Sequence, residues 1–240
     1  MVRGRPKNVS AIIQARMGSA RLPGKVMMDL HGKTVLARVI ERVKAAKTIT
    51  SICVATSKNA IDNAVLEEAK KNNVACFRGS EEDVLDRYNK AAAKLKSDIV
   101  VRVTADNPLT EPSFVDLCVD EVANKGYDFA AMKNVPYGSG AEVMRRSVLI
   151  KISKIAKKAS DREHVTSYLY KNTAGFKMVL IEPKTTLKRP DVRVTLDTAE
   201  DYLVLCRLFS RFSDAVSGRI GLKSAIDFLD KLCKNETRHL

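Results

Sequence analysis

The sequence has no tryptophan, and aromatic residues make up only 5% of its 240 residues. This scarcity argues against a protein that stacks unpaired bases on aromatic side chains, so we do not expect nucleic acid as its partner. Long apolar runs are also missing, and no segment approaches the roughly 20 residues of a membrane span. The apolar run near the basic start breaks at Gln14, short of the roughly 7–15 residues of an export signal. We therefore expect a cytoplasmic protein.

Cysteine and histidine are few and scattered. The five cysteines are an odd number, no C-x-x-C pair occurs, and none of the three histidines clusters with them. A disulfide framework or a zinc site needs paired and closer spacing, so we expect small apolar side chains in a reducing compartment. They are Cys53, Cys76, Cys118, Cys206 and Cys233.

Positive charge is what the chain has in excess. It carries 42 Lys and Arg against 28 Asp and Glu, a formal net charge of +14. Anionic partners are therefore attracted, and nucleic acid, acidic lipid and nucleotide phosphate all qualify. We expect residues 1–8 to form a basic arm that does not pack and residues 9–240 to form a single domain.

Short β-branched runs alternate with segments of helical period along the chain. Such alternation predicts an α/β fold in which a mostly parallel, Rossmann-like sheet is flanked by helices. Ser80 is the expected N-cap of the third helix. The expected strands cover residues 10–15, 51–56, 74–79, 98–104 and 192–196, and the expected helices cover residues 34–47, 60–73 and 80–96.

Ligands of such sheets bind beyond the carboxyl ends of the strands, so the residues that follow each strand matter. The first strand is followed by a loop with Arg16, Arg21 and Lys25. Asp106 and Asp197 follow two later strands. Cations neutralise phosphate charge, whereas carboxylates bind phosphate only through a hard metal ion such as Mg²⁺. Together the three strand ends predict a site for a nucleoside triphosphate with its magnesium.

Each carboxylate also has a purely structural interpretation. Asp106 suits the start of the turn before Pro108. Asp197 and Thr198 suit a helix N-cap, with Asp201 in the first turn. The conjunction of the three strand ends, rather than any one of them, favours the triphosphate site.

The loop after the first strand departs from two common phosphate-binding motifs. A P-loop needs G-x-x-x-x-G-K-[ST], but Gly18 and Gly24 are separated by five residues and Lys25 is followed by Val26. The dinucleotide fingerprint G-x-G-x-x-G is absent after the first strand. The loop therefore belongs to another class of phosphate site.

Six motifs follow one another along the chain: "IIQARMGSARLPGKVMMDLHGKTVLARVIERV", "VATSKN", "FRGSEEDVLDRY", "VRVTADNPL", "REHVTSYLY" and "VTLDTAEDY". In this order they resemble the cytidylyltransferase family of spore coat polysaccharide biosynthesis protein F. That family is similar to the sugar-acid cytidylyltransferases that make CMP-3-deoxy-manno-octulosonate and CMP-neuraminate. The likeness covers about residues 9–212 and implies a nucleotide-diphospho-sugar transferase (glycosyltransferase A-like) fold. It also implies Mg²⁺-dependent transfer of CMP from CTP, with release of pyrophosphate.

The resemblance assigns roles residue by residue. Arg16, Lys25, Asp106 and Asp197 match catalytic positions, and the two aspartates match the ligands of magnesium. A well-placed arginine is worth on the order of 10³–10⁵ in rate in other phosphoryl transfers, so we expect the cations of the loop to be sensitive. We expect Asp197, as a metal ligand, to assist deprotonation of an attacking hydroxyl. The implied nucleotide-binding residues are Ala15, Arg16, Gly18, Arg21, Lys25, Arg78, Gly79 and Ser80.

The acceptor side is less similar to the family. Glu142 is retained, but the residue two positions before it departs from the family pattern. We expect Ser160 or Asp161 to cap a helix whose first turn presents Arg162, Glu163 and His164 within reach of an anionic acceptor. Glu142, Arg162 and His164 are thus the expected acceptor residues, and the acceptor itself stays open among a nonulosonic acid, another sugar acid and an alditol phosphate. A homodimer is expected by analogy.

Two other functions stay open. Residues 144–158 have a basic face at helical spacing, which together with the N-terminal arm suits nucleic acid or an anionic surface. A CTP-binding module without turnover would carry the same binding residues. DNA or RNA binding with a steep salt dependence would indicate the first, and pyrophosphate release from CTP would indicate the enzyme. A last helix over residues 222–234 is expected to pack on the core or on a partner subunit.

Overall fold

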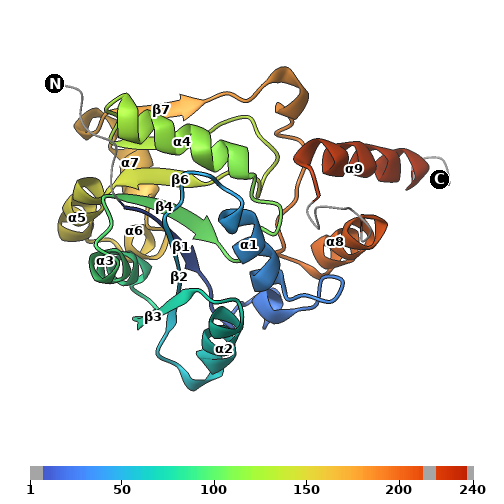
Figure 1. Ribbon diagram of the computed structural model, residues 1–240, viewed down its shortest axis with the longest axis horizontal. Coiled ribbons are helices and arrows are strands. Elements are labelled where there is room, and N and C mark those ends of the chain that lie inside the picture. The colour runs from blue at the N-terminus through green and yellow to red at the C-terminus, as the bar shows by residue number, and fades with distance from the viewer. Residues whose placement is uncertain (1–7, 213–219, 237–240) are drawn as a thin grey trace.

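The structure is a computed structural model that describes residues 8–212 and 220–236 (Figure 1). The strands in this part of the chain are β1 (Val9–Gln14), β2 (Ser51–Ser57), β3 (Ala75–Gly79), β4 (Ile99–Thr104), β5 (Phe129–Met132), β6 (Glu142–Arg145) and β7 (Met178–Ile181). They form a seven-stranded sheet of order β3-β2-β1-β4-β6-β5-β7. β6 runs antiparallel to both of its neighbours, and the other neighbouring pairs are parallel. The predicted α/β fold with a mostly parallel sheet is confirmed.

Helices cover both faces of the sheet, because each strand sends alternate side chains to opposite faces. In β1, Ile13 packs under one layer of helices and Ile12 under the other, and both are 0% exposed. The first layer is α1 (Val35–Lys44), α2 (Asn63–Lys71) and α4 (Pro112–Asn124), and the second is α3 (Val84–Lys94), α5 (Arg146–Ile155) and α7 (Ser167–Lys171) (Figure 1). The short α6 is Ala159–Glu163, and the 3-10 turns are η1 (Lys25–Met27), η2 (Ala60–Asp62), η3 (Thr173–Gly175) and η4 (Thr185–Leu187).

A third apolar cluster lies beside the sheet, where α8 (Ala199–Arg211) and α9 (Leu222–Glu236) pack together (Figure 1). α9 buries Leu222, Ala225 and Ile226 in this cluster. The expected last helix is therefore confirmed, and its apolar face packs on the core of its own chain.

The expected cap of α3 is wrong. Ser80 Oγ accepts a hydrogen bond from the Asp83 N–H at 3.1 Å and so closes a separate turn ahead of the helix. Asp83 is the cap, because its carboxylate accepts from the Asp86 N–H at 2.9 Å. The helix consequently starts at Val84 rather than near residue 80.

The expected cap at Ser160 or Asp161 is also wrong. α6 begins at Ala159, so both residues lie inside the helix and neither side chain caps it. A hydroxyl and an ammonium group of α7 hold the Asp161 carboxylate instead. Arg162 therefore falls in the last turn of this short helix, and His164 follows its end.

The expected strand over residues 192–196 is wrong as well. Val194 and Leu196 alternate into the core as a strand would, and they are 1% and 0% exposed. Their backbone N–H groups, however, donate to two different segments, at 2.8 Å to the Tyr137 carbonyl and 2.8 Å to the Asp106 carbonyl. The segment is thus an extended connection that ties the turn after β4 to the start of α8.

The expected basic arm lies outside the described residues except for Asn8, whose side-chain amide donates to the Leu95 carbonyl at 2.6 Å. Among helices that the structure describes, none has the length and apolarity that crossing a bilayer would require.

Candidate functional site

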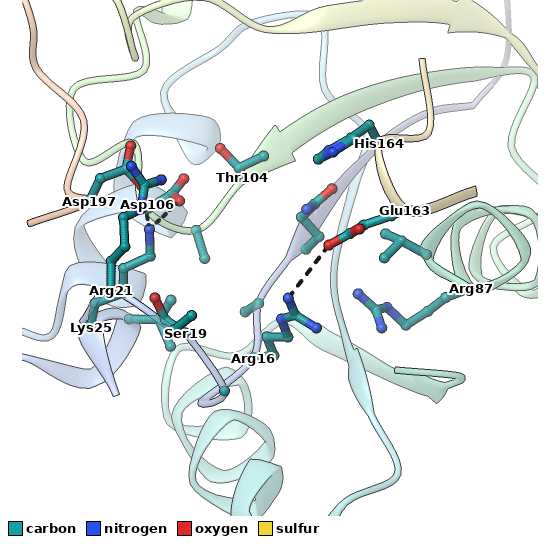
Figure 2. A pocket seen from close by; sticks show the side chains of 17 residues that line it. Arg16, Ser19, Arg21, Lys25, Arg87, Thr104, Asp106, Glu163, His164 and Asp197 are labelled. Atoms are coloured by element: carbon teal, nitrogen blue, oxygen red, sulfur yellow. Dashed lines mark hydrogen bonds and ion pairs between the residues drawn. The ribbon is translucent and has the colours of Figure 1, made fainter. Parts of the chain in front are cut away.

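A cavity of about 350 Å³ opens at the carboxyl ends of β1 and β4 (Figure 2). The loop over residues 15–26 forms one wall, and Val84 and Arg87 from α3 form another. The turn after β4, the end of α6 and Asp197 complete the lining. The parallel strands place these loops at one edge of the sheet, where such folds bind their ligands.

Lys25 joins the two aspartates of the cavity, Asp106 after β4 and Asp197 before α8. Its Nζ donates to Asp106 Oδ2 at 2.7 Å, to Asp197 Oδ1 at 2.8 Å and to the Leu196 carbonyl at 2.7 Å. Lys25 is 9% exposed and Asp197 is 8% exposed, so these charges are largely removed from water. Figure 2 shows this group, with Arg21, at one end of the cavity. The structure therefore brings the loop after β1, the turn after β4 and the segment before α8 together at one ammonium group.

Asp197 lies among several cations. Arg21 Nη2 is 3.2 Å from its Oδ1, and Arg193 Nη2 donates to its Oδ2 at 2.5 Å. Burial by itself raises the pKa of Asp197, but the hydrogen bond and charge of Lys25, together with Arg193 and Arg21, hold the pKa below its ordinary value. Asp197 is therefore an ionised carboxylate at neutral pH.

The structural interpretation of Thr198 is also correct. Thr198 caps α8 in a capping box with Asp201, whose carboxylate accepts from the backbone N–H groups of Asp197 and Thr198. Arg193 is bound to the same Asp201 carboxylate. The cap thus fixes the backbone of Asp197 without using its side chain.

Arg16 lies across the cavity from Lys25 (Figure 2). Its guanidinium is 3.7 Å from the Glu81 carboxylate and 3.8 Å from the Glu163 carboxylate. The Arg16 side chain is 41% exposed, so these contacts are long and solvated, and they contribute little energy. Arg16 is thus available to an anion that enters the cavity.

A buried carboxylate holds the loop after β1 in shape. Asp62 is 1% exposed, and it accepts from the Met17 N–H at 2.7 Å and from the Ser57 N–H at 3.2 Å. Gly24 has a φ of 72°, in the left-handed region, and its N–H donates to the Met17 carbonyl at 2.9 Å. This closed loop places Ala15 and Gly18 in the cavity wall.

The Arg78–Gly79–Ser80 turn and Arg162 do not line the cavity. The Arg78 guanidinium donates to the Ser57 carbonyl at 2.8 Å and to other groups of the β2–α2 connection. Arg162 Nε donates to Asp83 Oδ2 at 2.8 Å and its Nη1 donates to two backbone carbonyls. Arg162 therefore joins α6 to the cap of α3, and the structure does not bring it together with Glu142.

A second cavity of about 560 Å³ adjoins the first. His164, Gln14, Thr104, Asp106 and Asp197 border both cavities, with Arg21, so the two share one wall. The floor of the second cavity includes Glu142, the first residue of the antiparallel strand β6. Two ligands, one bound in each cavity, would therefore meet beside Asp106 and Asp197.

Glu142 is the floor carboxylate, and three donors already bind it. Arg102 Nη1 and the Thr166 hydroxyl donate to its Oε2 at 2.7 Å and 2.9 Å, and the Tyr170 hydroxyl donates to its Oε1 at 2.9 Å. The Glu142 side chain is 17% exposed. Its first role in the structure is therefore to hold Arg102 and Tyr170 at the cavity.

Sequence reasoning did not single out Gln14, Asp62 or Arg102 as site residues. Two of them carried a signal, because Gln14 stops an apolar strand and Arg102 is a charge inside a strand that is otherwise apolar. Asp62 sits in ordinary polar surroundings in the sequence, and only the folded chain places it against the loop after β1.

The paired aspartates are the candidate ligands of a metal ion. Residues 8–212 and 220–236 contain no group of three or more His, Cys, Asp or Glu side chains placed to hold one. Mg²⁺ commonly takes one or two carboxylates and fills its remaining positions with phosphate oxygens and water. Asp106 and Asp197 therefore fit a magnesium ion that arrives with a triphosphate, provided that the Lys25 ammonium yields its place.

Comparison with known proteins gives consistent matches. The sequence model of the cytidylyltransferase family matches residues 10–236. An uncharacterised protein of Methanocaldococcus jannaschii is 40% identical over 223 residues, which cover 93% of this chain and 90% of that protein. Spore coat polysaccharide biosynthesis protein SpsF of Bacillus subtilis is 35% identical over 205 residues, covering 83% and 85%. A solved cytidylyltransferase of Leptospira borgpetersenii is similar with a TM-score of 0.86 at 34% identity, and the match covers 95% of each chain.

Proposed function

The chain belongs to the cytidylyltransferase family, as its motifs indicated, and on that premise we propose that it transfers CMP from CTP to a hydroxyl of an anionic sugar or polyol acceptor. Pyrophosphate is the second product, and the acceptor serves the synthesis of surface polysaccharide or another glycoconjugate. One observation carries the proposal: two cavities adjoin at the Lys25, Asp106 and Asp197 group, so that a nucleotide and an acceptor can meet there.

The first cavity is the proposed nucleotide site. Arg16, Arg21 and Lys25 supply the positive charge that a triphosphate needs, and Ala15 and Gly18 leave room for it to approach the backbone. The Arg78–Ser80 turn is joined to the cavity wall by Arg87. This arginine lines the cavity, and its Nη1 donates to the Ser80 carbonyl at 2.5 Å. We propose that this turn supports the base end of the site.

Magnesium is the proposed cofactor, and Asp106 and Asp197 would hold it. When bound, the ion would polarise the phosphates and neutralise the charge that develops on them. The protein's own part is to position the reactants and to stabilise charge, for which Arg16, Arg21 and Lys25 are placed on two sides of the cavity (Figure 2).

Asp197 is a poor candidate for taking a proton. Its pKa is held below the ordinary value despite burial, by Lys25 and the nearby guanidinium groups. A carboxylate with a lowered pKa is a weak base, so the expected deprotonation by Asp197 is not part of this proposal. Its proposed role is to hold the metal ion and to orient Lys25.

The second cavity is the proposed acceptor site, with His164 at its border and Glu142 in its floor. Arg162 is left out, because its guanidinium is bound to Asp83 and to backbone carbonyls away from the cavity. We propose that the protein acts in the cytoplasm as a homodimer, and sedimentation of the purified chain tests the dimer.

Ligand-induced stabilisation tests the nucleotide. Binding to the native state raises the unfolding free energy by about 2.7 kcal/mol at a ligand concentration of roughly 100 times Kd. We expect CTP with Mg²⁺ to raise the unfolding temperature more than ATP, GTP or UTP does. Asp106→Asn should weaken this response, whereas Asp120→Asn, an exposed carboxylate of α4, should leave it unchanged.

Pyrophosphate release tests the transfer. CTP, Mg²⁺ and a panel of sugar acids and alditol phosphates should give release that depends on one acceptor class. Stabilisation by CTP without release from any acceptor would favour the non-catalytic CTP-binding module, and equal responses to all four nucleotides would contradict the assignment of CTP.

A further inference from the structure

Two buried polar atoms without a partner lie at the edge of the second cavity. Gln14 Oε1 and Arg102 Nε make no hydrogen bond in the described part of the chain, and both residues line that cavity. An unpartnered buried polar atom costs roughly 1–3 kcal/mol, so native proteins seldom retain one without a reason. A ligand that pairs with both atoms would recover this cost.

The sheet brings the two side chains to the same place. β1 and β4 are neighbours in parallel register, with Ile12 opposite Arg102 and Gln14 opposite Thr104. Side chains in paired positions point to the same face of a parallel sheet, so Gln14 and Arg102 stand diagonally on one face. Both residues therefore lie on one face of the sheet and line the same corner of the cavity.

This corner is neutral overall. Arg102 is bound to Glu142 at 2.7 Å, so its positive charge is balanced by a carboxylate that also accepts from Thr166 and Tyr170. What the corner offers a ligand is one N–H donor on Arg102 and one carbonyl acceptor on Gln14. A carboxylate placed there would meet the Gln14 carbonyl oxygen and the nearby Glu142 charge, whereas a hydroxyl both accepts and donates.

We propose that Gln14 and Arg102 recognise an uncharged hydroxyl of the acceptor and so select a polyhydroxylated substrate, with Glu142 as the residue that positions Arg102. This inference rests on the proposed function. The acceptor's hydroxyl-bearing part lies in this corner, and its anionic group lies elsewhere in the cavity. An acceptor without the hydroxyl leaves both atoms unpaired, which is the kind of penalty that gives strong discrimination.

Binding can be followed directly at the two side chains. In ¹⁵N-labelled protein, ribitol 5-phosphate or 3-deoxy-manno-octulosonate should shift the side-chain amide resonances of Gln14 and the Nε–H resonance of Arg102. In Gln14→Met, which keeps the volume and removes the carbonyl, Kd for the bound probe should rise about three- to tenfold, as expected for one neutral hydrogen bond. Arg102→Lys keeps a cation beside Glu142 and should weaken binding by a similar factor.

Thr56→Val is the matched control. Thr56 Oγ1 is likewise buried without a partner, but Thr56 borders neither cavity. Its replacement should leave the Kd of either probe unchanged. If Gln14→Met binds both probes as tightly as the wild type, or if neither probe moves either resonance at millimolar concentration, the proposal is overturned.

Kinetics separate this inference from the proposed function. Where an acceptor supports turnover, Gln14→Met should raise the KM for that acceptor and leave the KM for CTP unchanged, and a rise only in the KM for CTP would overturn the inference. Shifted resonances without pyrophosphate release from any acceptor would contradict the proposed transfer and leave the hydroxyl site supported. Turnover with an unchanged acceptor KM in both Gln14→Met and Arg102→Lys would support the proposed transfer and contradict the hydroxyl site.

Discussion

Two basic regions of the molecule differ in what surrounds their lysines. In the proposed nucleotide site, Lys25 is 9% exposed and donates to two carboxylates and a carbonyl. On α5 and the connection after it, Lys154, Lys157 and Lys158 are exposed, and none lies within ion-pair distance of a described carboxylate. The net charge of +14 includes both regions alike. Burial and pairing, rather than the number of cations, distinguish the site.

The difference has an energetic basis. Exposed charges are screened by water and salt, and a surface ion pair is worth about 0–1 kcal/mol. A buried charge interacts several times more strongly with its neighbours, and losing its partner costs roughly 3–5 kcal/mol. A substitution in the Lys25 group should therefore change function and stability, while the same substitution on α5 should change neither.

The largest expected effect is that of Lys25→Met. It removes the cation nearest both aspartates, so pyrophosphate release should fall on the order of 10³-fold or more, as when a catalytic cation is lost in other phosphoryl transfers. Single-turnover release from CTP measures this loss. Lys154→Met, which removes an exposed lysine of α5, should retain the wild-type rate. Similar losses in the two variants would break the contrast between the regions.

The same variant should respond in the opposite direction to a metal ion. Without nucleotide, the Lys25 ammonium lies between Asp106 and Asp197 and competes with a cation for them. Two like charges about 4 Å apart repel by about 4 kcal/mol at an effective dielectric constant near 20. Lys25→Met should therefore bind Mn²⁺ at least about tenfold more tightly than the wild type, measured from the free-ion electron paramagnetic resonance signal. Weaker binding would show that Lys25 organises the two aspartates instead of competing for them.

Acid should remove the contribution of Asp197. Its pKa is lowered in the folded state, so its stabilising charge is fully present above the unfolded pKa of about 3.9 and is lost as the pH falls through the lower folded value. The difference in unfolding free energy between the wild type and Asp197→Asn should be constant from about pH 7 to 5, at roughly 1–3 kcal/mol. It should shrink below about pH 4. Urea denaturation at each pH measures it, and a difference that shrinks already near pH 6 would contradict the lowered pKa.

Local sequence patterns predicted the four parallel strands β1 to β4 and placed Lys25 and Asp106 after two of them, because strand ends are encoded by short apolar runs and the residues just after them. The alternation of apolar residues at Val194 and Leu196 led to the wrong prediction of a strand. Alternate burial shows that a segment is extended, but it does not show that a neighbouring strand is close enough to pair with it. The extended segment instead donates hydrogen bonds to separate turns.

The second cavity was much less predictable. Its floor depends on β6 entering the sheet antiparallel beside β4, which sets Glu142 opposite Arg102 across 40 residues of sequence. Arg162 depends on where a five-residue helix begins, and a shift of the cap moved it from the expected first turn to the last. Register between distant strands and the start of short helices are settled by tertiary packing, so residue types alone did not indicate them.

The smallest expected effect is at the basic face of α5. The helix packs Val148, Leu149 and Ile152 into the core and leaves its lysines in solvent. In Lys154→Gln/Lys157→Gln/Lys158→Gln, the unfolding free energy should stay within about 0.5 kcal/mol of the wild type for each substitution. Pyrophosphate release should be unchanged, because water and salt screen exposed charges. At 0.1 M salt, exposed charges that are more than a Debye length of about 10 Å apart interact only weakly.

Binding to duplex DNA and to RNA, titrated at several salt concentrations, completes the comparison. If the face is only solvated, the wild type and the triple variant should bind equally weakly. A salt slope in the wild type that falls by nearly one for each lysine removed would mean that phosphates are neutralised there. The basic face would then bind a partner of its own, and its exposed, unpaired lysines would form a second binding surface. That surface would bind phosphates through counterion release, whereas the Lys25 group depends on burial and pairing.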